Sequence, residues 1–175
     1  MSAKVNNAFD IAFYFTERAE TEKKYLQPQK LQGLLFLSQS YYCAVSKGQS
    51  LMPAVFVADE RGPLEPNVHA AYSNGPPNIE TTLNLSKEVK YFLDSIWRRF
   101  GHMTTDQIMR ITKDSSAYKK AKGRGQRAEI YLKDMHFSFS APATKSGLDK
   151  DANSKFLRTQ AGKVVTVQKW HPKTK

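Results

Sequence analysis

The stretch KLQGLLFLSQSYYCAVSKG, residues 30–48, decides the fold of this chain. On a helix its large apolar residues cover more than half of the circumference: Leu31, Leu34, Leu35, Leu37, Tyr41, Tyr42 and Val45. Pro28 suits a first helical turn, because its missing N–H would have no partner there, and Gly48 suits a helix end. A helix that is apolar on most sides packs against several neighbours, so we expect residues 28–47 to form the central helix.

Two small residues inside this helix carry their own expectations. Gly33 costs about 1 kcal/mol relative to Ala in a helix interior, which indicates that another helix approaches closely there. Cys43 is the single cysteine of the chain, so no internal disulfide can form. It lies among apolar residues, which predicts a buried and inert thiol.

The segments on either side of the central helix contain clear start and turn signals. Ser2 is predicted to cap a helix that ends near residue 20, with apolar residues at three- and four-residue spacing. Residues 54–59, AVFVAD, are rich in β-branched residues and predict a short strand. The Gly-Pro pair at 62–63 turns the chain, and Pro66 opens a short helix.

Caps mark the helices of the second half. Ser86 is predicted to cap a helix that ends near residue 100. Thr104 and Gln107 form a capping box before a short helix, and Ser115 caps the next one. Residues 123–127, GRGQR, are expected to form a flexible basic loop. After them we expect an extended Ile130 followed by a helical turn.

These elements predict a mainly α protein: a compact domain of about six helices with a short β element near residues 54–59. Segments 155–159 and 163–170 have the pattern of a C-terminal β-hairpin. Strands are too few for a doubly wound sheet. Residues 141–154, APATKSGLDKDANS, have the composition of a linker, so we expect a helical domain at 1–140 and a basic, partly flexible extension at 141–175.

Composition indicates a globular protein of the cytoplasm. Of the 175 residues, 40% are hydrophobic and 25% are charged. No apolar run reaches the roughly 20 residues that span a bilayer, and the N-terminus lacks the pattern of a signal peptide. We therefore expect a cytoplasmic protein with no membrane partner.

The net charge of +11 lies mostly in the second half. Residues 110–127 contain one acid, Asp114, and residues 142–175 contain eight Lys or Arg against two acids. A solvated surface, an acidic protein partner and a nucleic acid each explain such an excess. The partner-binding hypothesis names Arg110, Lys113, Lys119, Lys120, Lys122, Arg124, Arg127, Lys155, Arg158, Lys163 and Lys169.

Tests for catalytic chemistry fail. No two of the four histidines have metal-ligand spacing, no carboxylate pair stands out, and no phosphate-binding or nucleophile motif is present. We therefore predict a protein that is not an enzyme and needs neither cofactor nor metal. A site assembled from scattered residues is the enzymatic alternative.

A nucleic-acid-binding regulator of its own operon is the second hypothesis. Residues 116–127, SAYKKAKGRGQR, interleave cations with Gly and Tyr, as phosphate-contacting loops do. Residues 104–121 place two short helices around a tight turn, which is similar to a helix-turn-helix. The second helix offers mainly Lys, which reads bases less well than Arg, Asn or Gln.

The opening stretch resembles the family pattern K-L-Q-K-L-L-aromatic-aromatic-x-Q. The matching residues are Lys30, Leu31, Gln32, Leu34, Leu35, Phe36 and Gln39. ERGPLEPNVHAAY, residues 60–72, resembles the family's Y-G-P-V-x-P-x-V-Y corner through Gly62, Pro63, Pro66, Val68 and His69. Four departures mark a divergent sequence: Gly33 replaces Lys, Leu37 and Arg61 replace aromatics, and Tyr118 replaces Trp.

These motifs resemble those of the Panacea domain family, also described as SocA-like or GepA-like, and the resemblance covers about residues 5–140. It implies a helical antitoxin of a bacterial or phage toxin–antitoxin pair that binds a cognate protein toxin. Some family members are described as adaptors that deliver the toxin to a cytoplasmic AAA+ protease.

Physically, most of the motif is expected to be structural. Leu31, Leu34 and Leu35 have the character of core residues, and the Gly-Pro pair at 62–63 shapes a turn. Lys30 and Gln32 are polar beside a buried helix and need partners, for which the Gly-Pro corner is the candidate. The sequence therefore places the working surface in the basic second half rather than in the motif.

Overall fold

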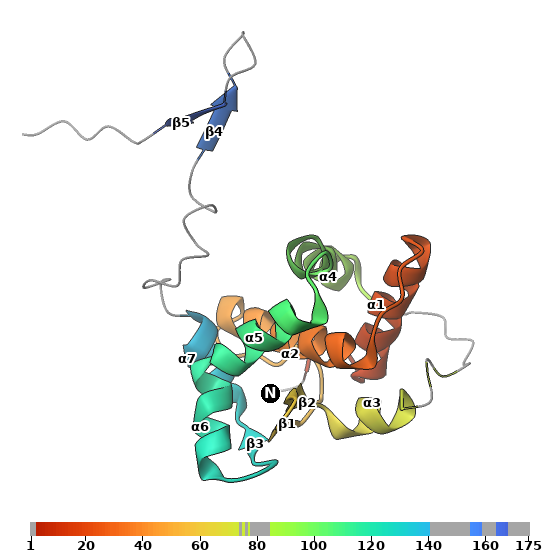
Figure 1. Ribbon diagram of the computed structural model, residues 1–175, viewed down its shortest axis with the longest axis vertical. Coiled ribbons are helices and arrows are strands. Elements are labelled where there is room, and N and C mark those ends of the chain that lie inside the picture. Colours follow the sequence, from red (N-terminus) through yellow and green to blue (C-terminus); the bar gives the residue numbers. More distant parts are fainter. Residues whose placement is uncertain are drawn as a thin grey trace, which may run out of the picture. The chain divides into compact units, whose positions relative to one another are not determined.

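A computed structural model of the chain describes residues 3–73, 75, 77 and 85–140, together with the backbone of 155–158 and 164–167. It divides into two compact units, residues 1–140 and 141–175. The described part of the first unit contains seven helices and one three-stranded sheet (Figure 1). In chain order they are α1 Phe9–Thr21, α2 Pro28–Val45, β1 Phe56–Asp59, β2 Gly62–Leu64, α3 Pro66–Ala71, α4 Lys87–Phe100, α5 Thr105–Asp114, α6 Ser116–Arg124, β3 Glu129–Ile130 and α7 Leu132–Ser140.

The helix predicted from residues 28–47 is the centre of the first unit. Every residue from 31 to 40 is buried on α2, including the polar ones. Five helices (α1, α3, α4, α5 and α7) and strand β2 pack on it (Figure 1). Gly33 faces α5: a Cβ at this position would lie 2.3 Å from Cγ2 of Ile108 and 2.6 Å from Cε of Met109. The expectation of a close helix approach at Gly33 is therefore confirmed.

The expectation that the first helix starts at Ser2 is wrong. α1 begins at Phe9, and residues 3–8 are not helical. The backbone N–H groups of Lys4 and Val5 donate to the carbonyls of Ser50 and Leu51, at 3.0 and 2.9 Å. The segment thus pairs with the loop after α2, and these long-range partners outweigh the local helix signal.

The segment predicted as a short strand is the middle strand of the sheet. β1 pairs antiparallel with β2 on one side and with β3 on the other, in the order β2-β1-β3. Phe56 and Ala58 point into the core and are fully buried. The Gly-Pro pair at 62–63 is itself part of β2, and Gly62 has a φ of +137°, which side-chain-bearing residues rarely adopt.

The predicted caps of the second half are confirmed. Ser86 accepts from the N–H of Val89, and Ser115 accepts from the N–H of Tyr118. The capping box of Thr104 and Gln107 has both of its hydrogen bonds.

Two details of the second half differ from expectation. α6 continues through Gly123 to Arg124, and the N–H of Arg127 donates to Ala58 of β1, so residues 123–127 are not a free loop. The closing helical turn is the nine-residue helix α7, which raises the helix count to seven.

In the second unit, β4 Lys155–Arg158 pairs antiparallel with β5 Val164–Val167. Among the helices described, none is both long and apolar enough to cross a membrane.

Candidate functional site

A cleft of about 580 Å³ opens beside the Gly-Pro corner. It lies between the start of α2, the β1–β2 hairpin and α3, with Met109 of α5 and Arg127 of the loop after α6 completing its wall. Gln32 from the stretch 30–48 and several residues of the stretch 60–72 meet here. The cleft is mixed in character, with apolar surface from Pro28, Pro63 and Leu64 beside charged and amide groups.

Asp59, at the end of β1, fixes the hairpin that forms one wall. Its Oδ1 accepts from the N–H of Arg61 at 3.2 Å, and its Oδ2 lies 3.0 Å from Nε of Arg127. The Tyr118 hydroxyl donates to the backbone carbonyl of Asp59. Burial acts to raise the pKa of Asp59, but the donors from Arg61 and Arg127 together lower it. The carboxylate therefore stays ionised and holds the tip of the hairpin.

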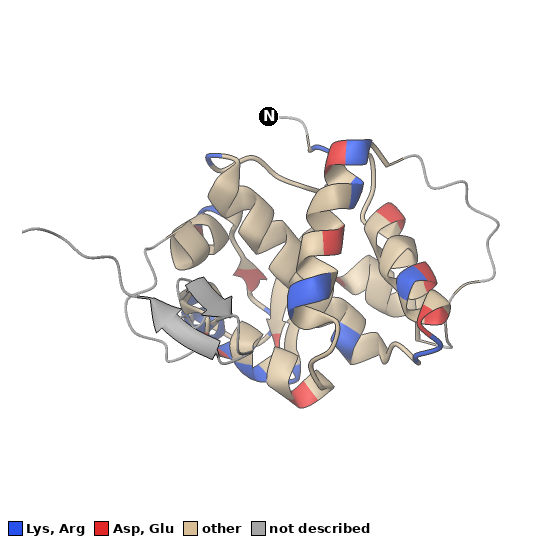
Figure 2. Cartoon of the chain, turned by 90° about the horizontal axis from the view of Figure 1, so that it is seen from above, with Lys and Arg blue, Asp and Glu red and all other residues tan. Residues whose placement is uncertain are grey.

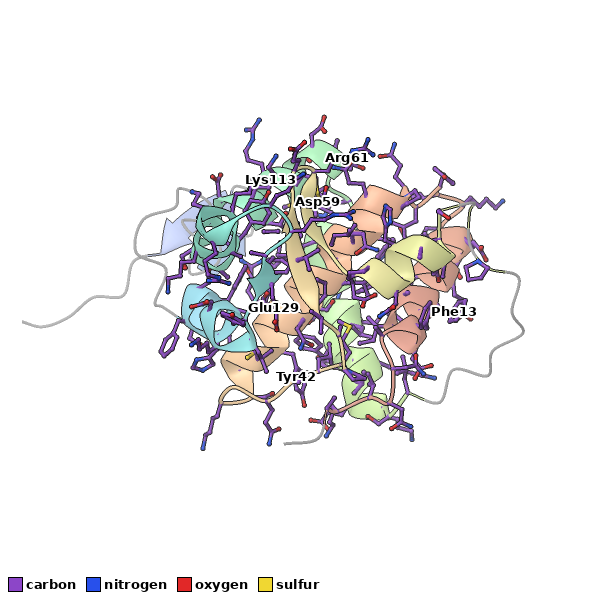
Figure 3. All side chains as sticks on the ribbon, turned by 90° about the horizontal axis from the view of Figure 1, so that it is seen from below. Phe13, Tyr42, Asp59, Arg61, Lys113 and Glu129 are labelled. Atoms are coloured by element: carbon purple, nitrogen blue, oxygen red, sulfur yellow. The ribbon has the colours of Figure 1, made fainter. Side chains whose placement is uncertain are left out.

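Two further side chains, one from α5 and one from α2, hold the turn between β1 and β2. Lys113 on α5 donates from Nζ to the carbonyl of Glu60 at 3.0 Å. Gln29 on α2 donates from Nε2 to the carbonyl of Arg61 at 3.1 Å. Figure 3 shows Asp59, Arg61 and Lys113 gathered at one edge of the first unit. The hairpin is thus held by α2, α5 and α6, which are distant from it in sequence.

The motif glutamine Gln32 ties α2 to the corner, as expected. Its Oε1 accepts from the backbone N–H of Glu65 at 2.7 Å. Glu65 in turn caps α3, because its Oε2 accepts from the N–H of Val68 at 2.6 Å. Lys30 does not take part: its Nζ donates to the carbonyl of Gly101 at 2.8 Å, at the C-terminal end of α4. The expectation that Lys30 bridges the corner is wrong, since its side chain projects toward α4 and caps that helix instead.

Other motif residues are structural. Leu31, Leu34 and Leu35 are at most 1% exposed, Gly62 and Pro63 are buried within β2, and Pro66 is the first residue of α3. Gln39, which is 2% exposed, accepts from the N–H groups of Leu51 and Met52, each at 3.1 Å. Its carboxamide therefore fixes the loop after α2, a contact that was not predicted from the sequence.

The predicted basic residues of α5 and α6 are largely paired within the fold. Lys119 lies 3.1 Å from Asp114, and Lys120 lies 3.2 Å from Asp134. Arg124 contacts the same Asp134 and stacks over the ring of Tyr131. The sequence counted one acid in residues 110–127, but the fold brings further acids to these cations from β1 and α7. Figure 2 shows acidic segments interspersed among the basic ones.

Arg110 and Lys122 are the two predicted cations of α5 and α6 for which no charged or hydrogen-bonding partner is found within the described residues. Arg110 lines a shallow groove of about 330 Å³ on α5, together with Lys113 and two aspartates. Met109 borders both this groove and the cleft. The structure therefore brings Arg110, Lys113 and Arg127 to neighbouring surfaces that meet at Met109.

The predicted cations of the second unit are described only through the backbone. Lys155 and Arg158 are the first and last residues of β4. Lys163 and Lys169 lie outside the described residues.

In the part of the chain that the structure describes, no group of three or more His, Cys, Asp or Glu side chains could hold a metal ion. Cys43 is buried, its thiol faces the carbonyl of Leu132 at 3.7 Å, and burial raises its pKa. This thiol is therefore protonated and shielded at neutral pH.

Sequence reasoning did not single out several residues that line the cleft, among them Tyr25, Gln29 and Asp59. Gln29 and Asp59 are ordinary polar residues in their local sequence, and their roles come from contacts over long sequence distances. The signal that pointed to the cleft was Gln32, a polar residue beside a buried helix in need of a partner.

Comparisons with models of protein families, with curated proteins and with solved structures return no match for this chain.

Proposed function

We propose that this chain is the antitoxin of a bacterial or phage toxin–antitoxin pair and neutralises a cognate protein toxin by direct binding. The proposal draws on the resemblance of residues 30–48 and 60–72 to the Panacea pattern. The observation that carries it is the convergence of these two stretches on one open cleft.

The cleft suits a protein partner. Its volume of about 580 Å³ lies within the range of ligand-binding pockets. Tyr25 at the rim is 75% exposed, and Tyr side chains are enriched at interfaces because they combine an apolar ring with a polar tip. The guanidinium groups of Arg61 and Arg127 flank the same wall and favour an acidic segment.

An adaptor role is the second form of the same proposal. In this form the chain binds the toxin and presents it to a cytoplasmic AAA+ protease. Because the protease is cytoplasmic, this form of the proposal requires a cytoplasmic protein. The basic second unit, with eight Lys or Arg in residues 142–175, is the candidate contact for the protease or for an acidic face of the toxin.

Co-expression tests the proposal. The product of the neighbouring open reading frame is expressed alone and then together with this chain, and growth is followed. Growth arrest that this chain relieves supports an antitoxin. Toxicity that the chain leaves unchanged, with both proteins present in the soluble fraction, contradicts it.

The half-life of the toxin separates the two forms. Rapid loss of the toxin in cells with an intact AAA+ protease, and its persistence in cells without that protease, supports delivery. Neutralisation with an unchanged toxin half-life supports occlusion. The same growth assay with residues 1–140 alone assigns the role of the second unit: retained relief places the function in the first unit.

Operon binding is the alternative function, favoured by Arg110 and Lys122, for which no partner is found among the described residues, and by the sequential helices α5 and α6. Lys119 and Lys120 on α6 form ion pairs with acidic residues, so they are less available to bind phosphates. A gel shift with the upstream operon DNA tests it, because phosphate binding is strongest at low salt. No shift at low salt removes this alternative.

A further inference from the structure

We infer that the cleft contains a carboxylate-binding subsite, formed by the first turn of α2, the carboxamide of Gln32 and the guanidinium of Arg61, which takes an acidic peptide segment of a protein partner. The inference rests on the proposed function for the identity of that partner as the toxin. The chemistry of the subsite is argued from the cleft itself.

Gln32 supplies a buried donor without a partner. Its side chain is 3% exposed and lines the cleft. Its oxygen accepts from the N–H of Glu65, which fixes the orientation of the carboxamide. No described residue accepts from its Nε2, and that nitrogen is not among the fully buried orphan atoms, so it is reachable from the cleft. The oxygen of this buried carboxamide thus has a hydrogen-bond partner, whereas its nitrogen is open to the cleft. An acceptor group of a ligand would satisfy this nitrogen.

The start of α2 supplies a positive end in the same wall. α2 has 18 residues, Gln27 at its N-cap makes no side-chain cap, and the first turn contains no acidic residue. The first intrahelical bond is that of Leu31, and no described group accepts from the N–H of Gln29 or Lys30. Unpaired N–H groups and the helix dipole together favour a negative group.

The charges around the cleft match one carboxylate. Arg61 contributes its backbone to the hairpin, and no described residue forms a hydrogen bond or ion pair with its guanidinium, which acts on Asp59 only through its charge. Arg127 uses Nε on Asp59, the carboxylate that lines the cleft. Because Asp59 already accepts hydrogen bonds from Arg61 and Arg127, its negative charge is largely neutralised within the protein. The charged residues that line the cleft therefore leave one net positive charge, which suits a carboxylate better than a phosphate monoester of about −2 charge.

The apolar parts of the cleft favour a peptide over a free anion. Pro28, Pro63 and Leu64 line it, and Tyr25 stands exposed at its rim. An acidic side chain in an extended segment would place its carboxylate at Gln32 and its aliphatic stem and neighbours on these surfaces. A small anion would leave them uncovered.

Binding of fluorescein-labelled hexaglutamate to the full chain, followed by fluorescence anisotropy at low salt, tests the inference. We expect saturable binding that a hexalysine peptide does not show and that inorganic phosphate does not displace. In nitrogen-15 spectra, the side-chain amide of Gln32 and the backbone amides of Gln29 and Lys30 should shift on titration. Displacement by phosphate would make this a general anion site and overturn the peptide assignment.

Two variants and one control locate the binding. Arg61→Glu reverses a charge at the rim and should weaken hexaglutamate binding by about tenfold. Gln32→Glu keeps an oxygen for the N–H of Glu65 but loses the donor, so it should weaken binding to a similar degree. Arg110→Glu reverses an exposed charge in the neighbouring groove and should leave affinity within about twofold. Equal losses in all three variants would overturn the subsite.

The outcome does not depend on the behaviour of one variant. If Gln32→Glu fails to fold, as judged by circular dichroism, Arg61→Glu and the Gln32 amide signal decide. Wild-type toxin neutralisation that Arg61→Glu leaves intact overturns the subsite and leaves the proposed function standing. Hexaglutamate bound at Gln32 by a chain that neutralises no toxin overturns the proposed function and leaves the subsite.

Discussion

The side-chain oxygen of Gln32 accepts a hydrogen bond from the backbone N–H of Glu65 at 2.7 Å, and this bond joins the central helix to the Gly-Pro corner. Glu65 then caps α3 through Val68. One carboxamide therefore connects the stretch 30–48 with the stretch 60–72. Gln32 also lines the cleft, so a residue with a structural role borders the surface proposed for binding.

The apolar face of α2 should tolerate no charge. Leu35→Asp places a carboxylate at a position with no exposed surface and no partner, so we expect a loss of more than about 4 kcal/mol of folding free energy. Val45→Asp on the same helix is the matched control, since Val45 is 71% exposed and should change stability little. Urea unfolding followed by circular dichroism measures both. A folded Leu35→Asp variant that lost only partner binding would show that this helix is an interface.

Gly33 should reject even one methyl group. Gly33→Ala would put Cβ 2.3 Å from Cγ2 of Ile108, whose β-branched side chain cannot easily move aside. We expect destabilisation of about 1–3 kcal/mol from overpacking, despite the better helix propensity of Ala.

Gly123→Ala on α6 is its control, because nothing lies within 4 Å of the added Cβ. This change should stabilise the protein by up to about 1 kcal/mol. Thermal unfolding of the two variants should therefore move in opposite directions. Equal stability changes would mean that α5 does not pack on Gly33 as closely as described.

The pair of Asp59 and Arg127 should make stability depend on acid pH. The pKa of Asp59 is lowered in the folded protein, so its contribution is present above the unfolded value of about 3.9 and is lost as pH falls through the folded value. Arg127→Gln should raise the pKa of Asp59 and cost about 0.2–1 kcal/mol at neutral pH, because Arg127 is mostly exposed.

The pH dependence of unfolding separates this pair from a generic loss of packing. The difference between wild type and Arg127→Gln should shrink toward zero at a pH below both values of Asp59. A constant difference at all pH values would contradict the ion pair as its cause. The carboxyl carbon-13 signal of Asp59 reports its titration directly.

Cys43 should be inert in the folded protein. Its thiol is buried and its pKa is raised, so the reactive thiolate is scarce. We expect no reaction with a disulfide reagent such as Ellman's reagent under native conditions and full reaction of one thiol in denaturant. Rapid native labelling would indicate that α7 opens away from α2.

The helical order could be predicted from sequence because its signals are local. The apolar surface of α2, the caps at Ser86 and Ser115 and the capping box at Thr104 each act within a few residues. The start of α1 could not, because the pairing of Lys4 and Val5 with the loop at 50–51 is a long-range contact that no local pattern shows.

The site was harder to predict because it is assembled from distant parts. Lys113 and Arg127 were named for their charge alone, yet both hold the hairpin at Asp59 and Glu60. Conversely, Lys119 and Lys120 seemed free in sequence and are paired in the fold. From the sequence we predicted that the partner-binding surface lies in the basic second half and not in the motif. The cleft instead borders both the motif and part of the basic half.

The affinity of the purified chain for the proposed toxin, taken as the product of the neighbouring gene, tests the proposed role of the cleft most directly. Isothermal titration with wild type, Arg61→Glu and Arg110→Glu would compare one rim charge inside the cleft with one outside it. We predict tight binding by wild type, a loss of about tenfold or more in Arg61→Glu, and a change within about twofold in Arg110→Glu. Wild-type affinity in Arg61→Glu with binding lost in Arg110→Glu would place the interface on α5 and contradict the cleft.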